Sequence, residues 1–333
     1  MKQLAREIIN GRRLTAKDDL SQLITADLSV LCEGANEIRK CLCGNRIDLC
    51  SIVNGRAGRC SENCSFCAQS AHHYTACEEY GFQDTGKFLD DCKHVYEQGV
   101  NHFSIVTAGR ALEGSDLEKA IAAYAALHRE YPDMILCASH GLMNTENLRK
   151  LVEAGVTMYH SNIETSERFF PNICTTHSFA DKLEEIKRAT EAGLTVCSGG
   201  IFGMGETWQD RIDMALTLAD LGITSIPLNF LIPIHGTPLG GRPMLAQDEI
   251  LRIVALFRYL NPTAFLRISA GRCYFEDGGK TLFESGANAT LTGDLLTTIG
   301  NQTRQDREML TSMGFELKTL PYKRENHECQ QNN

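Results

Sequence analysis

The chain has 333 residues and a formal net charge of -9 at pH 7. This acidic balance, without any run of basic residues, argues against a partner such as nucleic acid or an anionic membrane. No apolar stretch approaches the ~20 residues of a membrane span, and the N-terminus MKQLAREIIN is too polar for a secretory signal. The 14 cysteines therefore predict a cytoplasmic protein that uses thiols as ligands more than as disulfides.

Helix-like and strand-like segments alternate along most of the chain. A helical N-terminal extension is expected over residues 1–45. Apolar, β-rich runs predict strands at 46–54, 102–109, 134–141, 157–164, 195–203, 225–233, 264–271 and 287–294. Amphipathic stretches between them have apolar residues at three- and four-residue spacing and predict helices, for example at 116–131, 179–193 and 208–222. The polar segment 317–333 predicts a disordered tail.

This alternation over residues 46–316 predicts an α/β fold, a parallel (β/α)₈ barrel of the TIM type. A doubly wound open sheet is the alternative. Strands that are buried on both faces read as nearly continuous Val, Ile and Leu, whereas several strands here carry Cys, Ser, His, Asn, Glu or Arg. We therefore expect a barrel whose interior holds ligands.

Three cysteines, Cys60, Cys64 and Cys67, follow the first expected strand as CSENCSFC. Iron–sulfur clusters are held by cysteine thiolates, and only three ligands leave one iron open to a substrate or cofactor. The spacing, with an aromatic residue before the last Cys, resembles the signature of the radical S-adenosylmethionine (radical SAM) enzymes. The alternatives are free buried cysteines or a structural zinc site, which usually brings a second ligand pair.

Two further cysteines and one arginine lie on other expected strands, where their side chains can face the barrel interior. These are Cys137 on the third strand, Cys197 on the fifth and Arg267 on the seventh. A buried arginine needs an anionic partner, and a cluster with thiolate ligands is anionic. One interpretation is thus a second cluster deep in the barrel. The other is that both cysteines fill the core while Arg267 pairs with a carboxylate.

Five blocks of sequence, in this order, resemble the biotin synthase family of radical SAM enzymes. They are GRCSENCSFCAQS, VCSGGIFGMGET, LNFLIPIHGTPL, LRISAGR and SGANATLTGDLLTT, and the resemblance runs from about Asp48 to Phe315. It implies conversion of dethiobiotin to biotin by 5′-deoxyadenosyl radicals, which S-adenosylmethionine yields at a [4Fe–4S] cluster held by Cys60, Cys64 and Cys67. It also implies an auxiliary iron–sulfur cluster that donates sulfide, an electron donor such as flavodoxin or ferredoxin, and a homodimer.

The resemblance implies roles for single residues as well. These are ligation of the auxiliary cluster by Cys137, Cys197 and Arg267; hydrogen bonds to the ureido ring of dethiobiotin by Asn162 and Asn229; and contacts with S-adenosylmethionine by Glu164, Gly199, Gly200 and Lys182. Glycine suits such a contact because the absence of a side chain lets backbone approach closely. For Lys182, a solvated helix charge is the alternative.

The chain departs from the commonest form of this family at the auxiliary cluster. Ser104 stands where a fourth ligand, a cysteine on the second strand, is usual, and serine is a poor match for soft iron–sulfide chemistry. Four cysteines are additional to that form: Cys41, Cys43, Cys50 and Cys174. Our hypothesis is an auxiliary cluster, [2Fe–2S] or a variant, that recruits Cys43 or Cys50. The alternative is that these are ordinary buried thiols.

Two other functions compete with this one. A related radical SAM enzyme, such as a hydrogenase-cofactor maturase, shares the barrel and the cysteine triad. A non-catalytic iron–sulfur carrier or zinc-stabilised scaffold shares only the ligands. Asn162, Asn229 and Arg267 favour the first function, because they match its substrate and sulfur-donor sites together.

Overall fold

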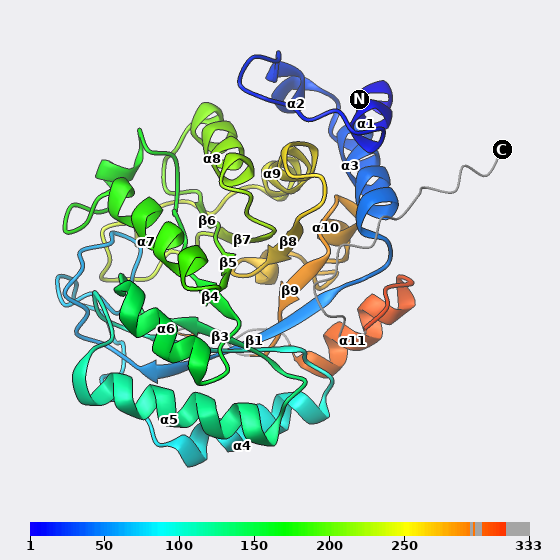
Figure 1. Cartoon of the computed structure of the whole chain (residues 1–333). Helices are drawn as coiled ribbons and strands as arrows, with labels where there is room; N and C mark the ends of the chain where they lie inside the picture. The colour runs from blue at the N-terminus through cyan, green and yellow to red at the C-terminus, as the bar shows by residue number, and fades with distance from the viewer. Residues whose placement is uncertain (294–295, 297–301, 318–333) are drawn as a thin grey trace.

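The centre of the molecule is a closed sheet of short parallel strands (Figure 1). The computed structural model describes residues 1–293, 296 and 302–317. The strands are β1 (Asp48–Arg56), β2 (His102–Thr107), β3 (Ile135–Ser139), β4 (Met158–His160), β5 (Thr195–Cys197), β6 (Gly200–Phe202), β7 (Ser225–Phe230), β8 (Phe265–Ile268) and β9 (Ala289–Leu291). Their order is β5-β4-β3-β2-β1-β9-β8-β7-β6, and β5 also pairs with β7, which closes the sheet.

Within the described residues this is an eight-stranded barrel, because β5 and β6 are two parts of one expected strand. The stretch 195–203 is interrupted at Ser198 and Gly199. Below the interruption Cys197 pairs with Ser225 of β7, and above it Gly200 pairs with Leu228 of the same strand. The predicted (β/α)₈ barrel is confirmed, and the open-sheet alternative is wrong because the sheet has no free edge between β5 and β7.

Helices surround the barrel on the outside (Figure 1). They are α1 (Lys2–Ile9), α2 (Ser21–Thr25), α3 (Leu28–Cys43), α4 (Thr85–Glu97), α5 (Gly114–Glu130), α6 (Thr145–Glu153), α7 (Phe179–Glu191), α8 (Trp208–Asp220), α9 (Gln247–Leu260), α10 (Lys280–Glu284) and α11 (Thr303–Ser312), with 3₁₀ turns η1 (Phe170–Asn172) and η2 (Arg272–Tyr274). The expected N-terminal helical extension is present as α1–α3, and α3 packs against α9 and α1. The expected tail lies outside the described residues from 318 onward.

Local sequence explains where the helices next to the active-site end begin. Ser178 and Asp181 form a reciprocal capping box at the start of α7, and Thr207 and Asp210 form another at the start of α8. Each box satisfies backbone donors that the first helical turn leaves unpaired. These caps define where α7 and α8 begin, at the ends of the loops that follow β4 and β6 at the barrel mouth.

Side chains of the strands alternate between the helix layer and the barrel interior. In β2, Phe103 and Ile105 are fully buried against the apolar core, while His102 and Ser104 line an internal cavity. Strand side chains point to opposite faces with a period of two, so polar residues at alternate positions all face inward. Among the described helices, none is long and apolar enough to cross a membrane.

Candidate active site

The barrel interior contains a cavity of about 230 Å³, and residues from each of the strands β1 to β9 line it. The structure brings eight of the predicted site residues to it: Cys50, Ser104, Cys137, Asn162, Glu164, Cys197, Asn229 and Arg267. Phe66, the aromatic residue of the cysteine motif, also lines the cavity, so the loop after β1 covers one end of it. That end is the carboxyl end of the strands, where barrels of this type carry their active sites.

Three thiols and an arginine lie in the deeper part of the cavity. Cys50, Cys137, Cys197 and Arg267 are all buried. Cys137 Sγ lies 3.8 Å from His102 Nδ1. Burial raises the pKa of the Cys50 thiol to about 12, which Arg267 opposes. These thiols therefore stay protonated until a cation or cluster replaces their protons.

Arg267 also has a carboxylate partner, which the sequence left open. Its Nη2 lies 3.6 Å from Asp48 Oδ2, and His102 Nε2 lies 3.3 Å from the same oxygen. Burial disfavours the Asp48 carboxylate, but His102 and Arg267 outweigh it and hold the pKa of Asp48 below its ordinary value. Asp48 and His102 were missed from sequence; the available signal was that Asp48 lies two residues before Cys50 and so shares its face of β1.

The positions predicted for the auxiliary cluster do not all lie in the cavity. Ser104 lines the cavity and pairs in register with Cys137. Cys43, the last residue of α3, lies outside the cavity, where its thiol contacts Arg258 Nη1 at 3.3 Å and the Pro262 carbonyl oxygen at 3.6 Å. Of the two tentative ligands, the structure brings Cys50 to the other thiols and leaves Cys43 among backbone carbonyls.

The two asparagines are each fixed by backbone groups. Asn162 Oδ1 accepts a hydrogen bond from Gly199 N at 3.0 Å, and its Nδ2 donates to Glu164 Oε2 at 3.3 Å. Asn229 Nδ2 donates to the Gly200 carbonyl at 3.1 Å. Each amide group has more donors and lone pairs than these contacts use, so both side chains are held in place while keeping capacity for a ligand.

Glu164 occupies an unusual backbone conformation beside Gly200. Its φ is 67°, and it forms a parallel bridge with Gly200. A side chain at Gly200 would overlap the Glu164 carbonyl, so the close contact between these two segments by itself requires a glycine here. Burial raises the pKa of the Glu164 carboxyl to about 7, with Lys182 and Asn162 opposing the shift. Lys182 itself ion-pairs with Glu185, at 3.7 Å.

The cysteine triad lies in a loop held by its own backbone. Cys60 N donates to the Gln69 carbonyl at 2.9 Å, and Cys67 N donates to the Cys64 carbonyl at 3.0 Å. Burial raises the pKa of the Cys67 thiol to about 11. Three thiols on one short loop are donors of the type and number that an iron–sulfur cluster with one open iron requires.

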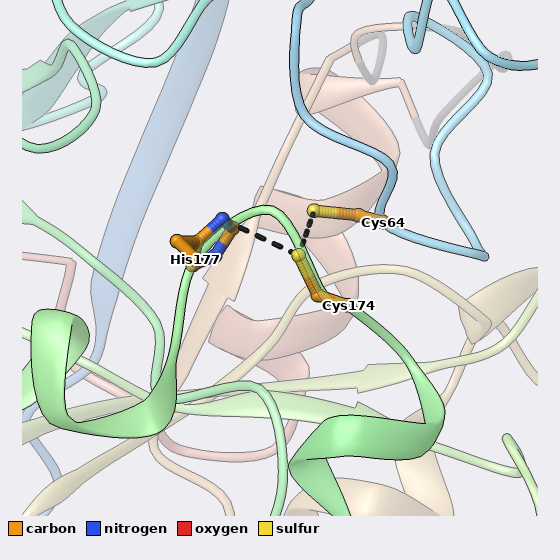
Figure 2. Close-up of side chains that lie close together, drawn as sticks. All are labelled: Cys64, Cys174 and His177. Carbon is orange, nitrogen blue, oxygen red and sulfur yellow. Dashed lines mark hydrogen bonds between the residues drawn. The ribbon is translucent and has the colours of Figure 1, made fainter.

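Cys174 and His177, from the loop between β4 and α7, lie beside Cys64 of this triad (Figure 2). Cys64 Sγ is 3.8 Å from Cys174 Sγ, which is 3.3 Å from His177 Nδ1. The hydrogen bond from Cys64 lowers the pKa of Cys174 to about 3 and raises that of Cys64. No role was predicted for Cys174, because only the fold brings it to Cys64.

Comparison with known proteins identifies the family. The radical SAM superfamily pattern matches residues 56–218, and the biotin and thiamin synthesis associated domain matches residues 227–316. A biotin synthase of Clostridium beijerinckii is 60% identical over 95% of this chain and 100% of its own length. One of Alkaliphilus metalliredigens is 57% identical over 95% and 99%. The chain belongs to the biotin synthase family.

Solved structures share the family's barrel at much lower identity. Methylornithine synthase superposes with a TM-score of 0.80 at 20% identity, covering 94% of this chain and 96% of that one. The [FeFe]-hydrogenase maturase of Carboxydothermus hydrogenoformans superposes with a TM-score of 0.76 at 17% sequence identity, covering 94% of this chain and 78% of that one. At these identities the likeness concerns the fold. Family membership confirms the predicted cofactors, a [4Fe–4S] cluster with S-adenosylmethionine and an auxiliary iron–sulfur cluster.

The cavity fits the auxiliary cluster. Cys50, Cys137 and Cys197 offer soft sulfur donors from three strands. Ser269 Oγ, in the cavity wall, is buried without a hydrogen-bond partner in the described part of the chain. Because buried polar groups are nearly always paired, such an atom indicates a wall completed by a separate group.

Proposed function

We propose that this chain converts dethiobiotin to biotin by inserting sulfur between two carbon atoms. One observation carries the proposal: a single cavity combines thiols and Arg267 in its depth, asparagine amides and Glu164 higher up, and the cysteine-triad loop over its mouth. The maturase-like alternative is supported by the barrel alone, since the likeness to the maturase is one of fold. Membership of the biotin synthase family favours dethiobiotin as the substrate.

The residues of the chain bind and orient the reactants. When bound, the [4Fe–4S] cluster with S-adenosylmethionine supplies a radical that removes hydrogen from an unactivated carbon, and the auxiliary cluster supplies the sulfide. Asn162 and Asn229 would hold the ureido ring, whose N–H and C=O groups complement an amide. The thiols of Cys60, Cys64 and Cys67 would hold the first cluster. The enclosed cavity excludes water from reactive species.

Contacts with S-adenosylmethionine are proposed at the upper edge of the cavity. Glu164 lines the cavity, and its carboxyl would accept hydrogen bonds from ribose hydroxyls. Gly199 and Gly200 keep the backbone beside it free of side chains. Lys182 has a 13% exposed side chain and affects the Glu164 carboxyl electrostatically, which supports a role near the cofactor's carboxylate.

For the auxiliary cluster we propose Cys50, Cys137, Cys197 and Arg267 as the residues that hold it. Cys50 replaces the soft donor that Ser104 lacks, and Cys43 is left out because its thiol contacts Arg258 away from the cavity. We expect Cys50→Ala to lose auxiliary iron and sulfide while keeping the [4Fe–4S] signal, and Cys43→Ala to keep both. Full auxiliary iron and sulfide in both variants would overturn the altered-ligation hypothesis.

The remaining expectations are a homodimer, an electron donor such as flavodoxin or ferredoxin, and a cytoplasmic location. Cysteines in the described residues are free thiols, which suits a reducing compartment. Sedimentation of the full chain tests the dimer, and reduction of the bound cluster by each candidate donor tests that partner.

The decisive experiment is an anaerobic reaction of the reconstituted, reduced protein with S-adenosylmethionine and dethiobiotin, followed by mass spectrometry. We expect biotin with about two 5′-deoxyadenosines per product, one for each carbon. Formation of 5′-deoxyadenosine without biotin, unchanged by dethiobiotin, would move the substrate elsewhere. Absence of any S-adenosylmethionine cleavage would favour a non-catalytic iron–sulfur carrier.

A further inference from the structure

Cys174 and His177 have no part in the proposed reaction, yet they form a cluster of ligand atoms with Cys64 (Figure 2). Among the described residues, this trio is the group of His, Cys or carboxylate side chains whose ligand atoms all lie within 4.8 Å of one another. Two of the three come from the loop between β4 and α7, and the third comes from the loop after β1. The grouping therefore arises from the fold.

Two of the three separations within this trio match those of a tetrahedral metal site, and the third is below 4.8 Å. With zinc–sulfur bonds of about 2.3 Å and a zinc–nitrogen bond of about 2.0 Å, tetrahedral geometry gives sulfur–sulfur and sulfur–nitrogen separations of about 3.8 and 3.5 Å. The structure has 3.8 Å between the Cys64 and Cys174 sulfurs and 3.3 Å between Cys174 Sγ and His177 Nδ1. The two separations that involve Cys174 therefore already suit a bound metal ion.

The two loops are fixed against each other independently of any ion. Asn63 Oδ1 accepts hydrogen bonds from Thr175 N at 2.9 Å and Thr176 N at 3.3 Å, and Asn63 N donates to Thr176 Oγ1 at 3.1 Å. Ser65 N donates to the Ile173 carbonyl at 2.8 Å. These contacts flank Cys64 on one loop and Cys174 on the other. A site built on such a support holds its donors in place before the ligand arrives.

The surroundings suit a divalent cation. Cys174 is 4% exposed and the His177 side chain is 8% exposed, so charges here are poorly screened. Two thiolates balance the charge of a divalent ion. Glu62 Oε2 lies 2.6 Å from His177 Nδ1 and accepts a hydrogen bond from Arg110 Nη1 at 3.2 Å. A metal ion bound to Nδ1 would therefore lie close to this carboxylate. Glu62 or a water molecule thus completes the tetrahedron.

We propose that Cys64, Cys174 and His177 bind one divalent transition-metal ion in the cluster-free chain. Binding releases to solvent the protons that the donor atoms still carry as metal–ligand bonds form, and no electron is transferred. Two thiolates and an imidazole select zinc over iron in the Irving–Williams order. Because Cys64 is shared, the ion and the [4Fe–4S] cluster exclude each other. This exclusion rests on the proposed ligand role of Cys64, whereas the metal site does not.

Cobalt titration of the cluster-free full chain under anaerobic conditions tests the site. We expect one equivalent of Co²⁺ to give sulfur-to-cobalt charge transfer and the intense visible bands of tetrahedral cobalt, and Zn²⁺ to abolish them. Cys174→Ser and His177→Asn should weaken binding by about tenfold or more. The double variant Cys60→Ser/Cys67→Ser should keep the spectrum, and Cys273→Ser, an exposed thiol, serves as a matched control.

The opposite pattern overturns the proposal. Cobalt bands that persist in Cys174→Ser but vanish in the Cys60→Ser/Cys67→Ser protein would place the ion on the triad. Absence of tetrahedral bands from the wild-type chain would remove the site altogether. Circular dichroism of each variant shows that folding is retained. None of these readouts requires biotin formation, so failure of the proposed reaction leaves them intact.

Competition with cluster assembly tests the exclusion. Cluster-free protein loaded with one equivalent of Zn²⁺ should incorporate [4Fe–4S] from ferrous iron and sulfide several-fold more slowly than zinc-free protein. In Cys174→Ser, zinc should have little effect on that rate. Equal rates with and without zinc in the wild-type chain would show that the cluster forms while the ion is bound, and would overturn the exclusion.

Discussion

Replacing Glu164 by glutamine should stabilise the cluster-free protein, and more so at alkaline than at acidic pH. Burial raises the pKa of this carboxyl from 4.5 to about 7. Between these two values the folded chain keeps a proton that the unfolded chain has released, so stability falls as the pH rises through this range. Glutamine has the same length and no charge, and therefore removes this loss.

The expected size follows from the shift. At about 1.4 kcal/mol per pKa unit, the shift corresponds to roughly 3 kcal/mol at full effect. The Glu164 side chain keeps partial exposure in the cavity, and solvent there screens its charge. We therefore expect Glu164→Gln to gain about 2 kcal/mol more at pH ~8 than at pH ~5.

Urea unfolding of both proteins, followed by circular dichroism at the two pH values, measures this difference. Glu167→Gln is the matched control, because Glu167 lies on the same loop and is exposed. We expect its effect on stability to be small at both pH values. An equal gain for Glu164→Gln at both pH values, or a loss at pH ~8, would refute the assignment of a buried, proton-retaining carboxyl.

Two further substitutions test the packing around the cavity. Gly200→Ala should lower the thermal midpoint, at a cost of about 2–3 kcal/mol, because the new methyl group overlaps the Glu164 carbonyl; Gly86→Ala, in open space on α4, should not. Asp48→Asn removes the carboxylate that ion-pairs with Arg267 and should cost about 3–5 kcal/mol in urea unfolding. A midpoint unchanged by either substitution would contradict the corresponding contact.

Much of the fold follows from the sequence because strand and helix periodicities differ. Polar residues at alternate positions of β2, such as His102 and Ser104, already indicate an interior that binds ligands. The interruption after Cys197 was not predicted, since TVCSGGIFG reads as one strand. At the interruption Gly199 N donates to Asn162, a residue of the loop after the neighbouring strand, and such non-local contacts leave no local pattern.

The site was predicted less completely for a related reason. Resemblance located Cys137, Cys197 and Arg267, and the fold brings all three to one cavity. It did not locate Asp48 as the partner of Arg267, because their pairing joins β1 to β8 across the chain. Nor did sequence separate Cys50 from Cys43, since only the direction of the α3 side chain sends Cys43 toward Arg258.

The amide of Asn162 has a consequence for how this enzyme can change. Its oxygen accepts a hydrogen bond from Gly199 N at the junction of β4 and β6, where the described residues pair through one bridge, at Glu164 and Gly200. The same side chain is proposed to hydrogen-bond the ureido ring of the substrate. A substitution that adapts position 162 to a different ring also removes the side-chain hydrogen bond to Gly199 N from the pocket wall. A substitution at this position therefore affects both substrate binding and the structure of the pocket wall. We expect new substrate specificity to arise first at positions that contact the substrate without supporting the wall.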